Sequence, residues 1–298
     1  MLQLLLSSFL LIVPATSWTV LPSSTARART TTRRKRGEKY SSPCSPLLSL
    51  ASSSSLTAKP FGRQDYWESF YQERRRVDNN VGNSITNNTP IETNDDVNAG
   101  STSFTWYAGF DDLEPFLRQF IKPRDRILIP GAGMDSLVLD MYDAGYQNLT
   151  VLDYAPSSMA YFERLREHRM IRTHVADVRD LRGLFPESSS PSSSFHYFDV
   201  ILDKGTLDAV SLAGDSMHEK RSNFIQATRE LQRVVKPAGG IVWSLSGICA
   251  DKLLSTKDLW DDQEWEILCD GSFYTTADGY TSNNFDSTLL VWRKQTKK

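Results

Sequence analysis

Three aspartates follow apolar runs of the chain, and a glycine-rich segment precedes them. In chain order these are Gly131-Ala132-Gly133, Asp153, Asp177 and Asp203. Parallel strands of an open α/β sheet end at one edge, where such sheets bind ligands, so residues that follow the strands should gather there. Glycines let the backbone approach a ligand closely, and an acid after the second strand suits a pair of ribose hydroxyls. The pattern predicts a site for a nucleoside cofactor.

The start of the helix expected after the glycine segment indicates which nucleotide fits. A dinucleotide-binding turn carries a third glycine for close helix packing, but Ser136 stands at that position. Asp135 adds a carboxylate near the positive end of the helix dipole, where it would repel a pyrophosphate. A positively charged cofactor without phosphates fits better, and S-adenosylmethionine meets this description.

Each candidate residue then has a specific task. We expect the glycine segment to contact the methionine moiety, and the ends of the next two strands to hold the ribose and the adenine edge. Asp203 would lie where the cofactor meets the substrate. For any one aspartate alone, a helix cap or a solvated loop residue is the better interpretation, and only their joint spacing favours a cofactor site. The expected cofactor-binding residues are Gly131, Ala132, Gly133, Asp153, Tyr154, Asp177, Val178 and Asp203.

Strand-like and helix-like segments alternate from Arg126 onward, which predicts an α/β fold with a doubly wound, Rossmann-like parallel sheet. A late hairpin would complete seven strands, with an antiparallel strand near the C-terminus. The expected strands are 126–130, 149–153, 172–176, 198–203, 240–244, 264–269 and 287–292. The expected helices are 135–144, 157–169 and 219–235.

Composition indicates one globular domain with extensions. The 298 residues are 40% hydrophobic and 23% charged, with a net charge of -2 that does not favour nucleic-acid binding. The three cysteines include no Cys-x-x-Cys pair and the four histidines are scattered, so neither a disulfide framework nor a metal site is predicted. We expect the folded domain to span residues 60–298. Two polar segments, residues 77–103 and 187–194, are expected to be surface insertions, the first of them disordered.

The N-terminal segments have the composition of targeting sequences. Residues 1–17 are apolar, end in small residues and are too short for a comfortable permanent membrane anchor, so a signal peptide is expected. Residues 18–59 are rich in Ser, Thr and Arg, with Glu38 as their single acid, as in a transit peptide or a disordered tail. The combination resembles the two-part presequences of algae with secondary plastids. Secretion and mitochondrial import remain the alternatives.

The segment Leu202-Asp-Lys-Gly-Thr-Leu-Asp-Ala209 resembles the signature of one group of seven-strand methyltransferases. Members of this group modify lysines or N-termini of proteins, among them translation elongation factor and citrate synthase. Four other segments resemble the group: the aromatic blocks 66–71 and 104–107, the cofactor loop 129–137 and the turn 234–240. The resemblance covers residues 64–294, although Thr105 stands where an acid is typical of the group.

The resemblance implies methyl transfer from S-adenosylmethionine to a lysine or an N-terminal amine of a protein, such as a translation factor or a metabolic enzyme. Asp203 would orient the target amine. Lys204 would either repel an incoming ammonium group or pair with a neighbouring acid. Trp67, Trp106 and Tyr107 would form an aromatic wall around the cofactor and the target, or else hold the N-terminal segment to the sheet.

Three other functions remain open at this stage. The same fold also methylates small molecules, and it can serve as a noncatalytic cofactor-binding module. An NAD-dependent dehydrogenase fits least well, because of Asp135, Ser136 and the absence of residues arranged for hydride transfer. Neither the acceptor, the number of methyl groups added nor the oligomeric state follows from the sequence.

Overall fold

The computed structural model describes most of the expected domain. The described residues are 60–84, 105–166, 168–186, 198–255, 259–272, 274–282, 285 and 287–296, all within the unit Ser42–Lys298. The expected signal peptide, the transit-like segment and the Ser- and Pro-rich segment 187–194 lie outside these residues. So do Phe104 and most of the insertion expected at 77–103.

A seven-stranded sheet with the order β3-β2-β1-β4-β5-β7-β6 forms the centre of the fold. Strands β1 to β5 pair in parallel, whereas β7 pairs antiparallel with both β5 and β6. This confirms the expected Rossmann-like sheet with its antiparallel C-terminal strand. The strands are β1 (Ile127–Pro130), β2 (Leu149–Asp153), β3 (Arg172–Val175), β4 (Val200–Lys204), β5 (Ile241–Ser246), β6 (Trp265–Asp270) and β7 (Thr288–Lys294).

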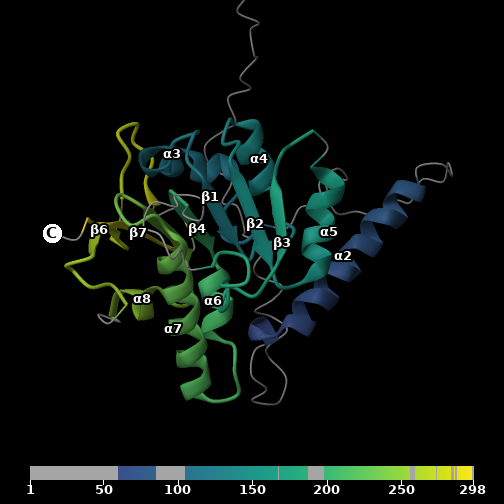
Figure 1. Ribbon diagram of the computed structural model, residues 1–298. Coiled ribbons are helices and arrows are strands. Elements are labelled where there is room, and N and C mark those ends of the chain that lie inside the picture. The colour runs from purple at the N-terminus through teal and green to yellow at the C-terminus, as the bar shows by residue number, and fades with distance from the viewer. Residues whose placement is uncertain are drawn as a thin grey trace, which may run out of the picture. The chain divides into compact units, whose positions relative to one another are not determined.

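Helices cover both faces of the sheet (Figure 1). The helices α4, α5 and α7 were expected, whereas α2, α3, α6 and α8 were not. Helix α2 continues to Ser84, which corrects the expectation of a disordered insertion starting at Val77. None of the helices in the described residues is both long and apolar enough to span a bilayer. The helices are α2 (Gln64–Ser84), α3 (Phe110–Phe120), α4 (Leu137–Asp143), α5 (Pro156–Leu165), α6 (Thr206–Ser211), α7 (Met217–Val234) and α8 (Ala250–Ser255), after the short 3-10 turn η1 (Pro60–Gly62).

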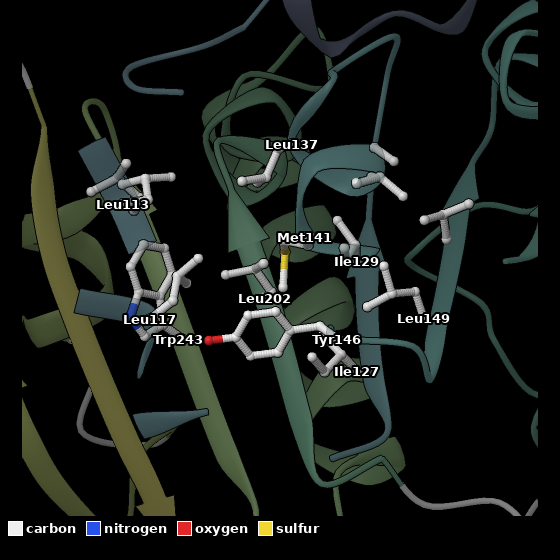
Figure 2. Packing of buried hydrophobic residues seen from close by; sticks show 14 of the residues in the cluster. Leu113, Leu117, Ile127, Ile129, Leu137, Met141, Tyr146, Leu149, Leu202 and Trp243 are labelled. Atoms are coloured by element: carbon white, nitrogen blue, oxygen red, sulfur yellow. The ribbon is translucent and has the colours of Figure 1, made fainter. Parts of the chain in front are cut away.

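Alternating strand residues build two separate hydrophobic cores. Successive side chains of a strand point to opposite faces, so Ile127 and Ile129 enter one core while Leu128 enters the other. Figure 2 shows the first core, where Leu117 of α3 and Met141 of α4 pack over the strands. Helices α6, α7 and α8 cover the second core. The central parallel strands β1, β2, β4 and β5 are buried and largely apolar, whereas the edge strand β3 is partly exposed. Parallel pairing holds the carboxyl ends of these strands in register.

Candidate functional site

A pocket opens at the edge of the sheet where the parallel strands end. Nine of the expected site residues line it: Gly131, Gly133, Asp153, Tyr154, Asp177, Val178, Lys204, Trp67 and Trp106. Ala132, Asp203 and Tyr107 do not belong to its lining. The structure therefore brings together most of the residues predicted from the sequence, although they come from six separate parts of the chain.

The glycine segment takes a backbone conformation that favours glycine. Gly131 and Gly133 have φ angles of 54° and 60°, in the left-handed region. A Cβ atom on Gly131 would lie 2.4 Å from Oγ1 of Thr206, so a side chain there would also collide with the start of α6. The Thr206 hydroxyl donates to the Pro130 carbonyl at 2.7 Å. The end of β1 and the start of α6 are thus in direct contact beside the pocket.

Asp153 is a buried carboxylate at the end of β2. Its two oxygens accept hydrogen bonds from the backbone amides of Gly133 (3.0 Å) and Ala155 (2.8 Å). Burial raises the pKa of Asp153 to about 6. Each carboxylate oxygen has a second lone pair, so the group keeps two acceptor positions beyond these amides. Two neighbouring hydroxyl donors in the pocket would match that capacity.

Asp177 and Val178 follow β3 and form another part of the pocket wall. The guanidinium of Arg179 binds both carboxylate oxygens of Asp177, with nitrogen–oxygen distances from 2.5 to 3.0 Å. Burial on its own would raise the pKa of Asp177, but the hydrogen bonds from Arg179 leave that pKa below its usual value. Val178 is buried and adds an apolar surface suited to a flat ring.

Asp203 has a structural position instead of the expected one. Its side chain is 0% exposed, and it accepts hydrogen bonds from the amides of Thr206 (3.0 Å) and Leu207 (3.1 Å) at the start of α6. Ser244 donates its hydroxyl to the other oxygen at 2.7 Å. Burial raises the pKa of Asp203 to about 7. This geometry makes Asp203 a helix-capping residue, and it corrects the expectation of a direct contact with a substrate amine.

Lys204 joins three segments of the chain. Its ammonium lies 2.5 Å from a carboxylate oxygen of Asp135, and the two side chains are 5% and 12% exposed. It also donates to the Thr105 hydroxyl (2.8 Å) and to the Trp106 carbonyl (2.7 Å). Of the two roles expected for Lys204, the structure shows pairing with an acid. It also corrects the electrostatic argument from Asp135, whose charge is compensated by Lys204.

Asp208 holds Tyr107 and was given no role from the sequence. One oxygen of Asp208 accepts from the Tyr107 hydroxyl (2.5 Å) and the Gly247 amide (2.9 Å). The other accepts from the Ser246 hydroxyl and the Ile248 and Cys249 amides. Burial, with the nearby Asp208 charge, raises the pKa of Tyr107, so Tyr107 stays a donor. The sequence did contain a signal for Asp208, because this residue belongs to the segment Leu202–Ala209 that resembles the methyltransferase signature.

Tyr107 adopts a backbone conformation that is unusual for its residue type. Its φ angle is 63°, in the left-handed region that costs energy for a bulky side chain. The ring fits because two neighbours lack side chains: a Cβ atom on Gly247 would lie 2.8 Å from the ring, and one on Gly205 would lie 3.2 Å from it. The bond to Asp208 and this packing therefore fix Tyr107 in its strained conformation.

The aromatic blocks form part of the pocket wall and part of the core together. The rings of Phe61, Trp67 and Trp106 lie 6.0 to 6.2 Å apart between centroids, and all three residues line the pocket. Trp67 is only 7% exposed and donates its indole N–H to the Phe61 carbonyl at 2.7 Å. Both roles expected for Trp67 and Trp106 are therefore compatible with their positions.

The first turns of α2 are held over the site by polar contacts. Glu68 accepts hydrogen bonds from the backbone amide (3.0 Å) and the hydroxyl (2.6 Å) of Ser157, at the start of α5. Gln64 donates to the Tyr154 carbonyl at 2.5 Å. A carboxylate at a helix N-terminus is favourable because the amides there lack partners within the helix. These contacts position Trp67 against the pocket.

Within the described residues, no three His, Cys, Asp or Glu side chains gather as a metal ligand set would.

The buried pair of Lys204 and Asp135 should be strongly coupled. Lys204→Met should lower the free energy of unfolding by about 3 kcal/mol, because it leaves a buried carboxylate without its cation. Asp135→Asn should also be destabilising, but the double variant should cost at least about 1 kcal/mol less than the sum of the two. Urea unfolding of the four proteins measures this coupling. Additive effects would contradict the ion pair.

The burial of Asp203 predicts a specific dependence of stability on pH. Its folded pKa of about 7 exceeds the unfolded value, about 3.9, so its contribution to stability is present at low pH and is lost as pH rises through 7. Asp203→Asn cannot titrate, so between pH 4 and pH 8 it should lose less stability than the wild type. Asp203→Ala should be less stable than Asp203→Asn by about 1 to 2 kcal/mol, because the cap is removed. Parallel pH profiles of wild type and Asp203→Asn in urea unfolding would contradict the raised pKa of Asp203. Equal stability of Asp203→Ala and Asp203→Asn would refute the capping role.

Comparison with known proteins gives sequence relatives with consistent names. No protein-family model matches the chain. The chain is 31% identical over 156 residues to the eEF1A lysine and N-terminal methyltransferase of Mus musculus, a match that covers 52% of this chain and 17% of the relative. It is 27% identical over 186 residues to the Drosophila melanogaster homolog of that protein, covering 62% of this chain and 22% of the relative. It is 32% identical over 150 residues to EEF1A lysine methyltransferase 4 of Mus musculus, covering 48% and 54%.

These matches are partial, since the chain spans less than a quarter of the length of the first two relatives. The strand order and the segment from Leu202 to Ala209 agree with the resemblance seen in the sequence. The chain is therefore a seven-strand α/β protein that is similar in sequence, over about half of its length, to the eEF1A lysine methyltransferases.

Proposed function

We propose that this protein transfers a methyl group from S-adenosylmethionine to an amine of a protein, most directly a lysine side chain or an N-terminal amine. The observation that carries the proposal is the Asp153 carboxylate, which lies in the pocket with two acceptor positions left beyond its backbone partners. The names of the relatives support the substrate class, because they are called lysine or lysine and N-terminal methyltransferases.

The residues of the pocket fit this cofactor. Asp153 would accept from the two ribose hydroxyls, with Tyr154 beside it, and Val178 with Asp177 would hold the adenine. The backbone of Gly131, Ala132 and Gly133 would run past the methionine moiety. The faces of Trp67 and Trp106 attract cations, which suits a sulfonium. When bound, S-adenosylmethionine supplies an electrophilic methyl group.

The protein's own task is to position the target amine and to favour its neutral form. A lysine amine with a pKa of about 10.4 is mostly protonated near pH 7, and deprotonating it costs about 4 kcal/mol. Enclosure in the pocket removes water from the amine, and desolvation disfavours its charged form. The acids near the pocket already have donors, since Asp135 pairs with Lys204 and Asp177 with Arg179. Positioning and exclusion of water are therefore the contributions we assign to these residues.

Identification of the acceptor tests this proposal. The purified full chain is incubated with methyl-labelled cofactor and a cell lysate that still contains its small molecules. We expect the label to appear on a protein, which mass spectrometry then identifies. A translation factor or a metabolic enzyme is the expected class. A labelled metabolite without labelled protein would instead support a small-molecule methyltransferase. Cofactor binding without any transfer would support a noncatalytic module.

Asp153→Asn should weaken binding of S-adenosylhomocysteine by about tenfold to a hundredfold, because hydrogen bonds to a charged acceptor contribute about 1.5 to 3 kcal/mol. Wild-type affinity should fall as pH decreases through 6, since protonation of Asp153 removes its charge. The variant should lack this pH dependence. Calorimetry from pH 5 to pH 8 measures both effects. The matched control Asp112→Asn, on the exposed face of α3, should bind like the wild type. Unchanged affinity in Asp153→Asn would exclude the ribose contact.

We also propose that the protein is delivered to a plastid, with a signal peptide at 1–17 followed by a transit segment at 18–59. Small residues before Trp18 and the scarcity of acids after it support this destination. A fluorescent protein fused to residues 1–59 should enter the plastid of an alga with secondary plastids. Fluorescence in mitochondria or in the medium would establish one of the two alternatives.

A further inference from the structure

A groove rich in arginine lies beside the pocket and has no role in the proposed chemistry. Its walls include Arg179 and Arg182 from the loop after β3, and Arg221 and Arg229 from α7. Ser222 and Gln226 of α7 lie between the last two. Arg179 also lines the cofactor pocket, so the groove begins at the edge of that pocket. We call this surface the arginine groove.

The sequence of α7 places the arginines on one stripe of the helix. Arg221, Ile225 and Arg229 follow one another at intervals of four residues, which puts them on the same side. Phe224, Ala227 and Leu231 take the buried side. Because α7 connects two parallel strands, it runs back from the edge of the sheet that holds the pocket. The arginine groove therefore leads from the pocket along the flank of the domain.

Two of the arginines are available to a partner. Arg221 and Arg229 are exposed, and neither side chain forms a hydrogen bond or an ion pair with any residue that the structure describes. The acids of the groove compete little for them. Glu230 already pairs with Arg233 at 2.7 Å and accepts a hydrogen bond from the Leu181 amide at 2.9 Å. Asp180 is the other acid in the lining of the groove. The groove is thus locally basic in a chain whose net charge is -2.

We infer that the arginine groove binds an extended acidic segment of the protein substrate, next to the site where its amine is methylated. This inference rests on the proposed function. Arg229 lies eight positions after Arg221 in the helix, a rise of about 12 Å. Carboxylates four residues apart in an extended peptide lie about 13 Å apart on one side, so two of them match the two guanidinium groups. Arginine binds carboxylates through paired hydrogen bonds, and Gln226 and Ser222 can bond the peptide backbone between them.

A nucleic acid fits this surface less well than a peptide does. Single-stranded nucleic acids bind along continuous basic tracks with aromatic rings for base stacking. The arginine groove is interrupted by Asp180 and Glu230, and His218 supplies its one ring among the described residues. An acidic peptide needs neither an uninterrupted basic track nor stacking surfaces. The class of partner is therefore a polypeptide with spaced Asp or Glu residues.

The test uses the full chain and a fluorescein-labelled peptide of alternating Glu and Ser residues, with a Gln and Ser peptide as the uncharged control. Fluorescence anisotropy should show binding of the acidic peptide that weakens as salt rises. The double variant Arg221→Gln, Arg229→Gln should bind it about five- to tenfold more weakly. The matched control Arg124→Gln, Arg172→Gln removes two exposed arginines at the opposite edge of the sheet and should bind like the wild type.

The outcomes separate this inference from the proposed function. Two results would show that the arginine groove is not a site for acidic peptides. One is equal affinity of the two double variants for the acidic peptide, and the other is equal affinity of the wild type for the acidic peptide and the Gln and Ser peptide. Tighter binding of a polyuridylate through Arg221 and Arg229 would replace the peptide by a nucleic acid. Binding of S-adenosylhomocysteine is measured on the same samples. If the cofactor binds and the peptide does not, only the inference fails; if no cofactor binds, the proposed function fails.

Discussion

Lys204 places an ammonium group where polar groups from separate parts of the chain converge at the end of β4. A buried cation is unfavourable unless it is paired and fully hydrogen-bonded, and here Asp135 supplies the charge while Thr105 and Trp106 supply acceptors. The Nζ atom of Lys204, at the end of β4, thus joins the sheet to Asp135, which follows the glycine segment, and to Thr105 and Trp106. The shape of the pocket depends on this junction, because Trp106 and Asp135 both line it.

The residues that flank Lys204 in the sequence also hold the walls of the pocket in place. Asp203 caps α6, Gly205 leaves room for the Tyr107 ring, Thr206 contacts the glycine segment and Asp208 binds the Tyr107 hydroxyl. Four successive contacts of one short segment therefore fix the walls of the pocket. In this account the segment that carries the family resemblance is first an architectural element. Chemistry belongs to the surfaces it arranges, namely the aromatic faces and the carboxylate of Asp153.

The sequence was sufficient for the sheet and for the pocket lining, and insufficient for the side-chain partners. Apolar runs with acids or glycines at their ends reveal the central parallel strands, so Asp153 could be placed at the pocket. Asp177 follows the more polar strand β3 and could be placed there from the alternation of strands and helices. The orientation of Asp203 could not be predicted, since a strand residue shifted by one position faces the opposite side. The pairing of Asp135 with Lys204 spans distant parts of the chain and leaves no local pattern. Helix α3 was missed because Pro115 inside it is normally a sign of a helix end.

Hydrogen–deuterium exchange of the full chain without cofactor tests most directly whether Lys204 holds the pocket together. Hydrogen exchange measures the free energy of local opening for each segment of the chain, so each segment of Lys204→Met can be compared with the same segment of the wild type. If Lys204 holds the pocket together, exchange in Lys204→Met should be faster for the peptides covering Thr105–Ala108 and Gly131–Leu137 together, with α7 unchanged. Faster exchange in only one of these two segments, or exchange equal to that of the wild type in both, would contradict it.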